Sequence, residues 1–180
     1  MKLYALLIYN EDYKQIYSNY NLDDFFFAYR SKMKETIEIF AKEVIKNVKK
    51  NSYYKITESA DDFDFTIYGS TFINYYIAIT NNSYPQRVAF ELLHTIQGTN
   101  MTQVSINTSF RTYQNPIEAD KILQIKQEID EAKLILLNSI DNLLDRGERM
   151  DQLLDKTEKL AEDSFLFRKK ARDLNCCIIL

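Results

Sequence analysis

An apolar seam in the C-terminal third of the chain constrains most strongly what this sequence can fold into. Between Glu118 and Leu174 there is no proline and only one glycine, Gly147. Mostly apolar side chains recur there at alternating steps of three and four residues, which is the pattern of a coiled-coil helix. Twelve of the sixteen seam positions are apolar, three carry small hydroxyls and one is Arg146. The other fifteen positions are Ile122, Ile125, Ile129, Ala132, Leu136, Ser139, Leu143, Met150, Leu153, Thr157, Leu160, Ser164, Phe167, Ala171 and Leu174.

This seam runs for more than seven heptads, so the sequence predicts one long helix that needs partner helices to cover it. Arg146 interrupts the seam and has two interpretations. It is either a surface arginine at the edge of the seam or a buried charge that fixes the register of a bundle. A buried guanidinium is costly unless all its donors are bonded. The second interpretation therefore predicts Gln or Asn at the same level of the partner helices.

The pattern of the sequence in the N-terminal part of the chain predicts a mixed α+β domain. Alternating and continuous apolar runs separated by turn residues indicate strands, and apolar residues at helical spacing indicate two helices. The resulting order β-β-α-β-β-β-α is that of an antiparallel sheet with helices on its faces. The polar stretch Thr99–Asn115 predicts a connector without helical periodicity. The expected strands are Lys2–Tyr9, Tyr13–Ser18, Tyr53–Glu58, Phe63–Tyr68 and Phe72–Thr80, and the expected helices are Ser31–Lys50 and Pro85–Gly98.

The last residues, Cys177–Leu180 (Cys-Ile-Ile-Leu), match the C-a-a-X pattern of prenylation. A final Leu favours geranylgeranyl over farnesyl. Because one lipid binds a membrane only marginally, stable anchoring needs a second signal. Cys176 is one candidate as a second lipid site. The basic cluster 168–172 is another, unless it is only a solvated helix end.

Several function classes are disfavoured. The net charge of −3 gives no reason to bind nucleic acid, and no apolar run is long enough to span a membrane. The N-terminus has no signal-peptide pattern, which predicts a cytosolic chain. The sequence contains no phosphate-binding Gly-rich loop. The single histidine, His94, is expected on the buried face of its helix, in the core of the domain. We therefore expect no enzyme activity, metal or cofactor other than covalent lipid.

Specific motifs resemble a known family. The segments 143–151 (LLDRGERMD) and 154–160 (LDKTEKL) are similar to the arginine-bearing, synaptobrevin-type SNARE motif. The segments 1–4 (MKLY), 84–90 (YPQRVAF) and 113–120 (YQNPIEAD), with Cys176 and Cys177, resemble the prenylated longin SNAREs of the Ykt type.

The resemblance implies a longin (profilin-like) domain with a five-stranded antiparallel sheet at 1–112. A linker at 113–120, an R-SNARE motif at 121–175 and a lipidation tail at 176–180 would follow. It implies a parallel four-helix bundle with Qa, Qb and Qc SNARE helices, in which Arg146 is the central ionic layer. Cys177 would carry the prenyl group, added by a prenyltransferase, and Cys176 a palmitoyl or second prenyl group.

In such proteins the bundle drives fusion in ER–Golgi, endosomal or vacuolar traffic. The longin domain folds the SNARE segment back and shields the lipid, which keeps a closed cytoplasmic pool beside the form on Golgi and vesicle membranes. Ile39, Phe40 and Phe26 are expected on that autoinhibitory surface. Ile39 lies off the apolar face of its helix, which makes it either exposed or a partly buried edge residue. For 25–27 (Phe-Phe-Phe) a buried strand and a docking surface are both open.

A lipid-anchored trafficking adaptor or tether without fusion activity is the alternative function. It would share the domain and the anchor but would not need Arg146. A coiled-coil homodimer is less favoured because it would stack Arg146 against its own copy.

The predicted anchor is tested by the substitution Cys177→Ser. Without the thiol no prenyl group can be attached, so we expect the variant to be lost from the membrane fraction of cells. Fractionation followed by immunoblotting measures this. Recovery of the variant in membranes at wild-type levels would refute the anchor.

Overall fold

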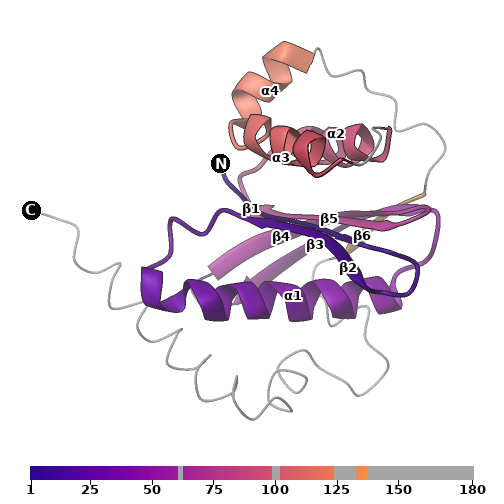
Figure 1. Cartoon of the computed structure of the whole chain (residues 1–180), viewed down its shortest axis with the longest axis horizontal. Coiled ribbons are helices and arrows are strands. Elements are labelled where there is room, and N and C mark those ends of the chain that lie inside the picture. The colour runs from indigo at the N-terminus through magenta and orange to yellow at the C-terminus, as the bar shows by residue number, and fades with distance from the viewer. Residues whose placement is uncertain (61–62, 99–101, 124–132, 138–180) are drawn as a thin grey trace, which may run out of the picture.

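The computed structural model describes residues 1–60, 63–98, 102–123 and 133–137. These residues form a six-stranded sheet in the order β2-β1-β5-β4-β3-β6, with helices on both faces (Figure 1). Helix α1 covers one face, and α2, α3 and α4 lie on the other. The strands are β1 (Leu3–Tyr9), β2 (Gln15–Tyr20), β3 (Ser52–Ala60), β4 (Phe63–Thr71), β5 (Tyr75–Asn81) and β6 (Lys133–Leu137). The helices are the 3-10 turn η1 (Phe27–Tyr29), α1 (Arg30–Asn47), α2 (Gln86–Gly98), α3 (Gln103–Thr112) and α4 (Pro116–Leu123).

The central strands β1 and β5 are apolar on both faces. All seven residues of β1 are buried, and so are the first six of β5. Side chains of a strand alternate between the two faces of the sheet, so a strand with apolar side chains on both faces must be covered on both sides. Leu7 faces the α1-side core, a buried cluster that includes Met33, Phe40, Val44 and Ile77.

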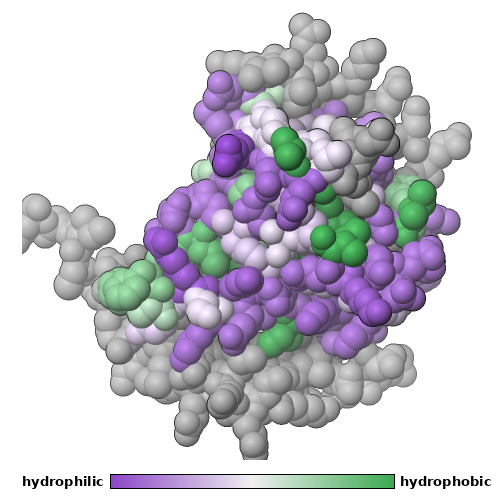
Figure 2. All heavy atoms as spheres, viewed as in Figure 1, coloured by the Kyte–Doolittle hydropathy of each residue, from purple (hydrophilic) through white to green (hydrophobic). Residues whose placement is uncertain are grey.

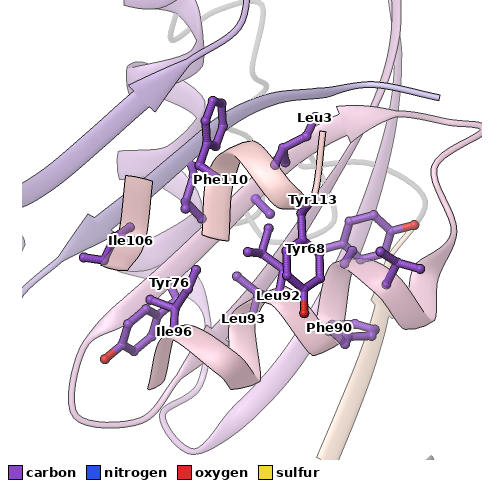
Figure 3. Packing of buried hydrophobic residues seen from close by; sticks show 14 of the residues in the cluster. Leu3, Tyr68, Tyr76, Phe90, Leu92, Leu93, Ile96, Ile106, Phe110 and Tyr113 are labelled. Atoms are coloured by element: carbon purple, nitrogen blue, oxygen red, sulfur yellow. The ribbon is translucent and has the colours of Figure 1, made fainter. Parts of the chain in front are cut away.

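Leu6 and Ile8 face the opposite cluster, the α2-side core. In it, Leu92, Leu93 and Ile96 of α2 lie among Ile106 and Phe110 of α3 and sheet residues such as Tyr68 and Tyr76 (Figure 3). The predicted order of the first five strands, α1 and α2 is confirmed, as is the α+β class with an antiparallel arrangement of β1 to β5.

Helix α3 forms where the sequence predicted a polar connector, and that prediction is wrong. The Thr102 hydroxyl caps the helix by accepting a hydrogen bond from the Ser105 amide at 3.2 Å. Ile106, Phe110 and Tyr113 are buried, at steps of four and three. The polar side of the helix also contacts the domain: the side-chain oxygen of Asn107 accepts from the Tyr17 hydroxyl at 2.7 Å. Hydrogen bonds from polar side chains attach this helix to β2. Three buried apolar residues are therefore enough to hold it on the domain.

The sixth strand is a second departure from the predicted fold. Lys133–Leu137 was predicted as part of the long seam helix, but it forms β6 and pairs with β3 in parallel. Of the seam positions, Ile122 lies in α4 and Leu136 in β6. The other fourteen, including Arg146, lie outside the described residues, so the long helix stays a prediction for them. Helix α4 occupies part of the segment predicted as a linker at 113–120.

A close contact between β3 and β4 explains one of the few glycines. Tyr54 of β3 has no exposed surface, and its ring lies over Gly69, the residue opposite it in β4. A Cβ atom at Gly69 would overlap the end of the Tyr54 ring. Only a glycine at position 69 therefore leaves room for the Tyr54 ring.

The substitution Gly69→Ala tests this packing. Because the buried ring cannot move into solvent, we expect overpacking to lower the free energy of unfolding by about 2–3 kcal/mol. Denaturant titration followed by circular dichroism measures this. Gly98→Ala is the matched control, since a Cβ atom there meets nothing within 4 Å, and it should change stability little. Equal stabilities of the two variants would contradict the packing argument.

Candidate functional site

The outer edge of β3 is the part of the sheet that binds a segment from the C-terminal third of the chain. β6 pairs with β3 over five residues, from Ser52 with Lys133 to Ile56 with Leu137. A sheet edge carries unpaired backbone N–H and C=O groups, which readily accept an additional strand. β6 supplies that strand, and it does so in parallel, whereas β4 pairs with β3 antiparallel on the other side.

The two central side chains of β6 have opposite environments. Ile135 is partly buried and packs against the α1-side core. Leu136 is 62% exposed. This difference follows from the alternation of side chains along a strand. The α1-side core therefore adds apolar packing at Ile135 to the backbone pairing.

Strand pairing and seam packing use different residues of the same segment. Leu136 is a seam position, and Ile135 is not. Packing Leu136 into a coiled coil requires a helix at 133–137, whereas pairing with β3 requires an extended strand. The segment cannot do both at once, so the observed strand and the predicted helix exclude each other.

The segment before α4 is attached to the domain by its own motif residues. The Tyr113 carbonyl accepts from the buried Tyr84 hydroxyl at 2.7 Å, and the side-chain NH2 of Gln114 donates to the Leu3 carbonyl at 3.0 Å. Asn115 caps α4: its side-chain oxygen accepts from the Glu118 amide at 3.3 Å, and its side-chain NH2 donates to the Glu118 carboxylate at 3.2 Å. Pro116 then occupies the first turn, where its missing N–H costs nothing. The chain therefore leaves the domain from a fixed point.

The three residues predicted for an autoinhibitory surface have different environments. Phe40 is buried in the α1-side core, and its ring stacks on that of Phe65 with 5.3 Å between the ring centroids. The prediction that Phe40 lies on the surface is wrong. Ile39 is partly buried and packs against the same core, which supports the edge interpretation. Phe26 is 51% exposed and its neighbour Phe27 73%. These two rings form an exposed pair, 4.7 Å apart, at the start of α1.

The interpretation of 25–27 as a buried strand is wrong, because η1 begins within it at Phe27. Figure 2 shows that apolar side chains on the visible face lie in separate places among polar ones. Of the two open interpretations, only a surface role remains available to Phe26 and Phe27.

The described residues contain no arrangement for acid–base or metal chemistry. Burial raises the pKa of Tyr9 and Tyr54 far above the usual value, and the hydroxyls of both lack a hydrogen-bond partner. Burial also raises the pKa of Tyr68 to about 12, so these phenols stay protonated near neutral pH. His94 is exposed on α2, and its predicted place in the core is wrong. In the ranges described, no three His, Cys, Asp or Glu side chains could hold a metal.

Comparison with known proteins agrees with this architecture. The longin family model, described as a regulated-SNARE-like domain, matches residues 22–121, which is more than half of the chain. The synaptobrevin model matches residues 121–179, the segment that contains β6. The chain belongs to the longin SNARE family.

Similar proteins include three fungal relatives of this longin SNARE, each described as a synaptobrevin homolog YKT6. The Candida glabrata protein is 37% identical over 123 residues, and the Saccharomyces cerevisiae protein is 36% identical over 123 residues. Each of these matches covers 58% of the chain and only 60% or 62% of the relative. The Schizosaccharomyces pombe protein is 29% identical over 198 residues, covering 99% of the chain and 100% of the relative. The longin and synaptobrevin families are not enzymes, in agreement with the expectation from the sequence.

The residues predicted to carry the SNARE chemistry lie outside the described residues. These are Arg146, the seam positions other than Ile122 and Leu136, and the cysteines Cys176 and Cys177. Their roles stay predictions. Within the described ranges, no helix is long and apolar enough to cross a bilayer.

Sequence reasoning missed the β3 edge, although β6 carries a signal. Residues 134–137 read Leu-Ile-Leu-Leu, and four consecutive apolar residues fit a strand packed on a sheet better than one seam of a helix.

The pairing of β6 with β3 is tested by two neighbouring substitutions. Ile135→Asp places a carboxylate against the α1-side core, so we expect β6 to leave the edge and those amides of 52–56 that face β6 to exchange about tenfold faster. Leu136→Asp should leave their exchange near the wild-type rate because Leu136 is exposed. Hydrogen–deuterium exchange by mass spectrometry measures both. Equal protection in the two variants would contradict the packing of Ile135.

Proposed function

We propose that this longin SNARE is a lipid-anchored R-SNARE that drives fusion of intracellular membranes, and that its longin domain restrains the SNARE motif before fusion. The pairing of β6 with β3 carries this proposal. β6 belongs to the segment that matches the synaptobrevin model, and the longin sheet holds it in a conformation that a SNARE bundle cannot use.

The energetic balance favours release once partners are available. The β6 pairing spans five residues, and each backbone hydrogen bond contributes about 1 kcal/mol net. The predicted bundle buries twelve apolar seam positions, each contributing about 1–3 kcal/mol when fully buried. Three partner helices therefore supply more free energy than the edge pairing. In their absence the pairing keeps the segment from associating through its apolar side chains.

In the assembled state we propose a parallel bundle of one helix from this chain with Qa, Qb and Qc helices. Arg146 would lie at its centre and donate to Gln side chains of the partners. The bonded guanidinium sets the register, because a shift by one layer would leave it unpaired in an apolar core.

The proposed anchor is a prenyl group on Cys177, geranylgeranyl or farnesyl, added by a prenyltransferase, with a palmitoyl or second prenyl group on Cys176. With two lipids the protein would stay on the cytoplasmic face of Golgi and vesicle membranes, and with one lipid it would exchange with the cytoplasm. Zippering toward Leu174 would then draw the anchored membrane toward the membrane of the partners.

A tether without fusion activity is the second candidate, because the exposed Phe26 and Phe27 pair offers the domain a further contact surface. Arg146→Gln distinguishes the two functions in a liposome fusion assay. A fusion SNARE should lose most of its activity and regain it with a partner whose central Gln is replaced by Arg. A tether should tolerate the substitution.

The restraint itself is tested with the same pair of β6 variants. Mixed with soluble Qa, Qb and Qc helices, Ile135→Asp should assemble several-fold faster than the wild type, because the edge pairing is lost while the seam is intact. Leu136→Asp should assemble into a less heat-resistant complex, because the seam is damaged while the pairing is intact. The gain of helical circular dichroism gives the rate, and thermal melting gives the stability of the complex.

Two outcomes would count against the proposal. If no variant gains helicity on mixing, the SNARE function fails. If Ile135→Asp assembles at the wild-type rate although exchange has shown that β6 is released, the restraint fails and the SNARE function stands.

A further inference from the structure

Three loops meet at one end of the sheet. They are 10–14 between β1 and β2, 48–51 between α1 and β3, and 72–74 between β4 and β5 (Figure 1). The register places them together: Tyr9 pairs with Tyr75, and Thr71 pairs with both Tyr75 and Ser52. We call these three loops, with the C-terminal end of α1, the loop end of the domain.

Two apolar side chains project from the loop end. Ile73, in the turn after β4, is 78% exposed. Tyr13 is 44% exposed and has a φ of 60°, a left-handed conformation that is costly for a bulky residue. Asn10 stabilises this turn, since its side-chain oxygen accepts from the Lys14 amide at 2.8 Å and its carbonyl from the Tyr13 amide at 3.0 Å. The Tyr13 ring rests against Tyr75 at 5.4 Å and is thereby held at the tip of the domain.

Exposed lysines lie on the same loops and on the C-terminal end of α1. The loop end carries five lysines and three carboxylates, an excess of two positive charges, although the whole chain has a net charge of −3. Two of the lysines lie near a carboxylate, Lys46 to Glu43 at 3.3 Å and Lys50 to Glu11 at 3.9 Å. The lysines are Lys14, Lys42, Lys46, Lys49 and Lys50, and the carboxylates are Glu11, Asp12 and Glu43.

We propose that the loop end is a peripheral membrane-binding face that contacts bilayers containing anionic lipid. Lysines are attracted to anionic head groups, and projecting aliphatic and aromatic side chains enter the boundary between head groups and acyl chains. Two separate tips offer much less apolar area than the roughly 800 Å² per partner of a stable protein interface, so a bilayer fits this face better than a protein does. This contact goes beyond the proposed function and does not depend on the lipid anchor.

The absence of tryptophan from the sequence allows a direct test in the full-length chain without lipid modification. Ile73→Trp places the only indole at the proposed contact, and Val104→Trp places it at an equally exposed site on α3, where Val104 is 75% exposed. With vesicles of phosphatidylcholine and phosphatidylserine, we expect the emission of Ile73→Trp to shift to the blue and that of Val104→Trp to stay unchanged. With phosphatidylcholine alone, neither should shift. No shift for Ile73→Trp, or equal shifts for both variants, would overturn the proposal.

Vesicle co-sedimentation tests the charge requirement. The double substitution Lys49→Gln and Lys50→Gln should weaken binding to the anionic vesicles about tenfold, because each lysine near such a surface contributes severalfold to the affinity. Ile73→Ser should also weaken it, and Val104→Ser should not. If both loop-end variants bind like the wild type, the vesicles are held by another segment, such as the basic residues 168–172, and the loop end is not the contact.

Discussion

Burial of β1 and β5 on both faces is the constraint on which the rest of the structure depends. A strand with no polar face must be covered from both sides, so helices are required above and below the sheet. α1 supplies one cover, and α2 with α3 supplies the other. This leaves β3 near one margin of the sheet with its outer edge open to a further strand, and β6 pairs there.

The β3 edge connects the fold with the proposed regulation. Because strand and helix have different periods, neighbouring residues of one segment face different partners in the two conformations. Ile135 packs on the α1-side core, and Leu136 belongs to the predicted seam. If the proposed function holds, the same five residues take part in both the restrained and the assembled state, and substitutions at adjacent positions separate the two. The cap at Asn115 fixes the start of α4.

The sequence predicted the first five strands and the helices α1 and α2 because their apolar periods are strong and their turns carry Asn, Asp, Gly or Pro. It failed for α3, where three buried residues suffice since Asn107 and the cap at Thr102 provide polar attachments. It also failed for His94, because helical period alone does not say which neighbouring positions the sheet will cover. For Phe40 the surface role implied by the family resemblance is wrong.

By itself, the sequence determined the α+β class, the order of the elements up to α2 and the family resemblance, and it predicts the seam. These depend on local composition and spacing, which can be counted along the chain. Only the tertiary structure decided that 133–137 forms a strand on β3, and that Tyr13 and Ile73 lie at the same end of the sheet, on loops that also carry lysines. Both depend on residues far apart in sequence coming together, and a free sheet edge exists only after the other strands have paired.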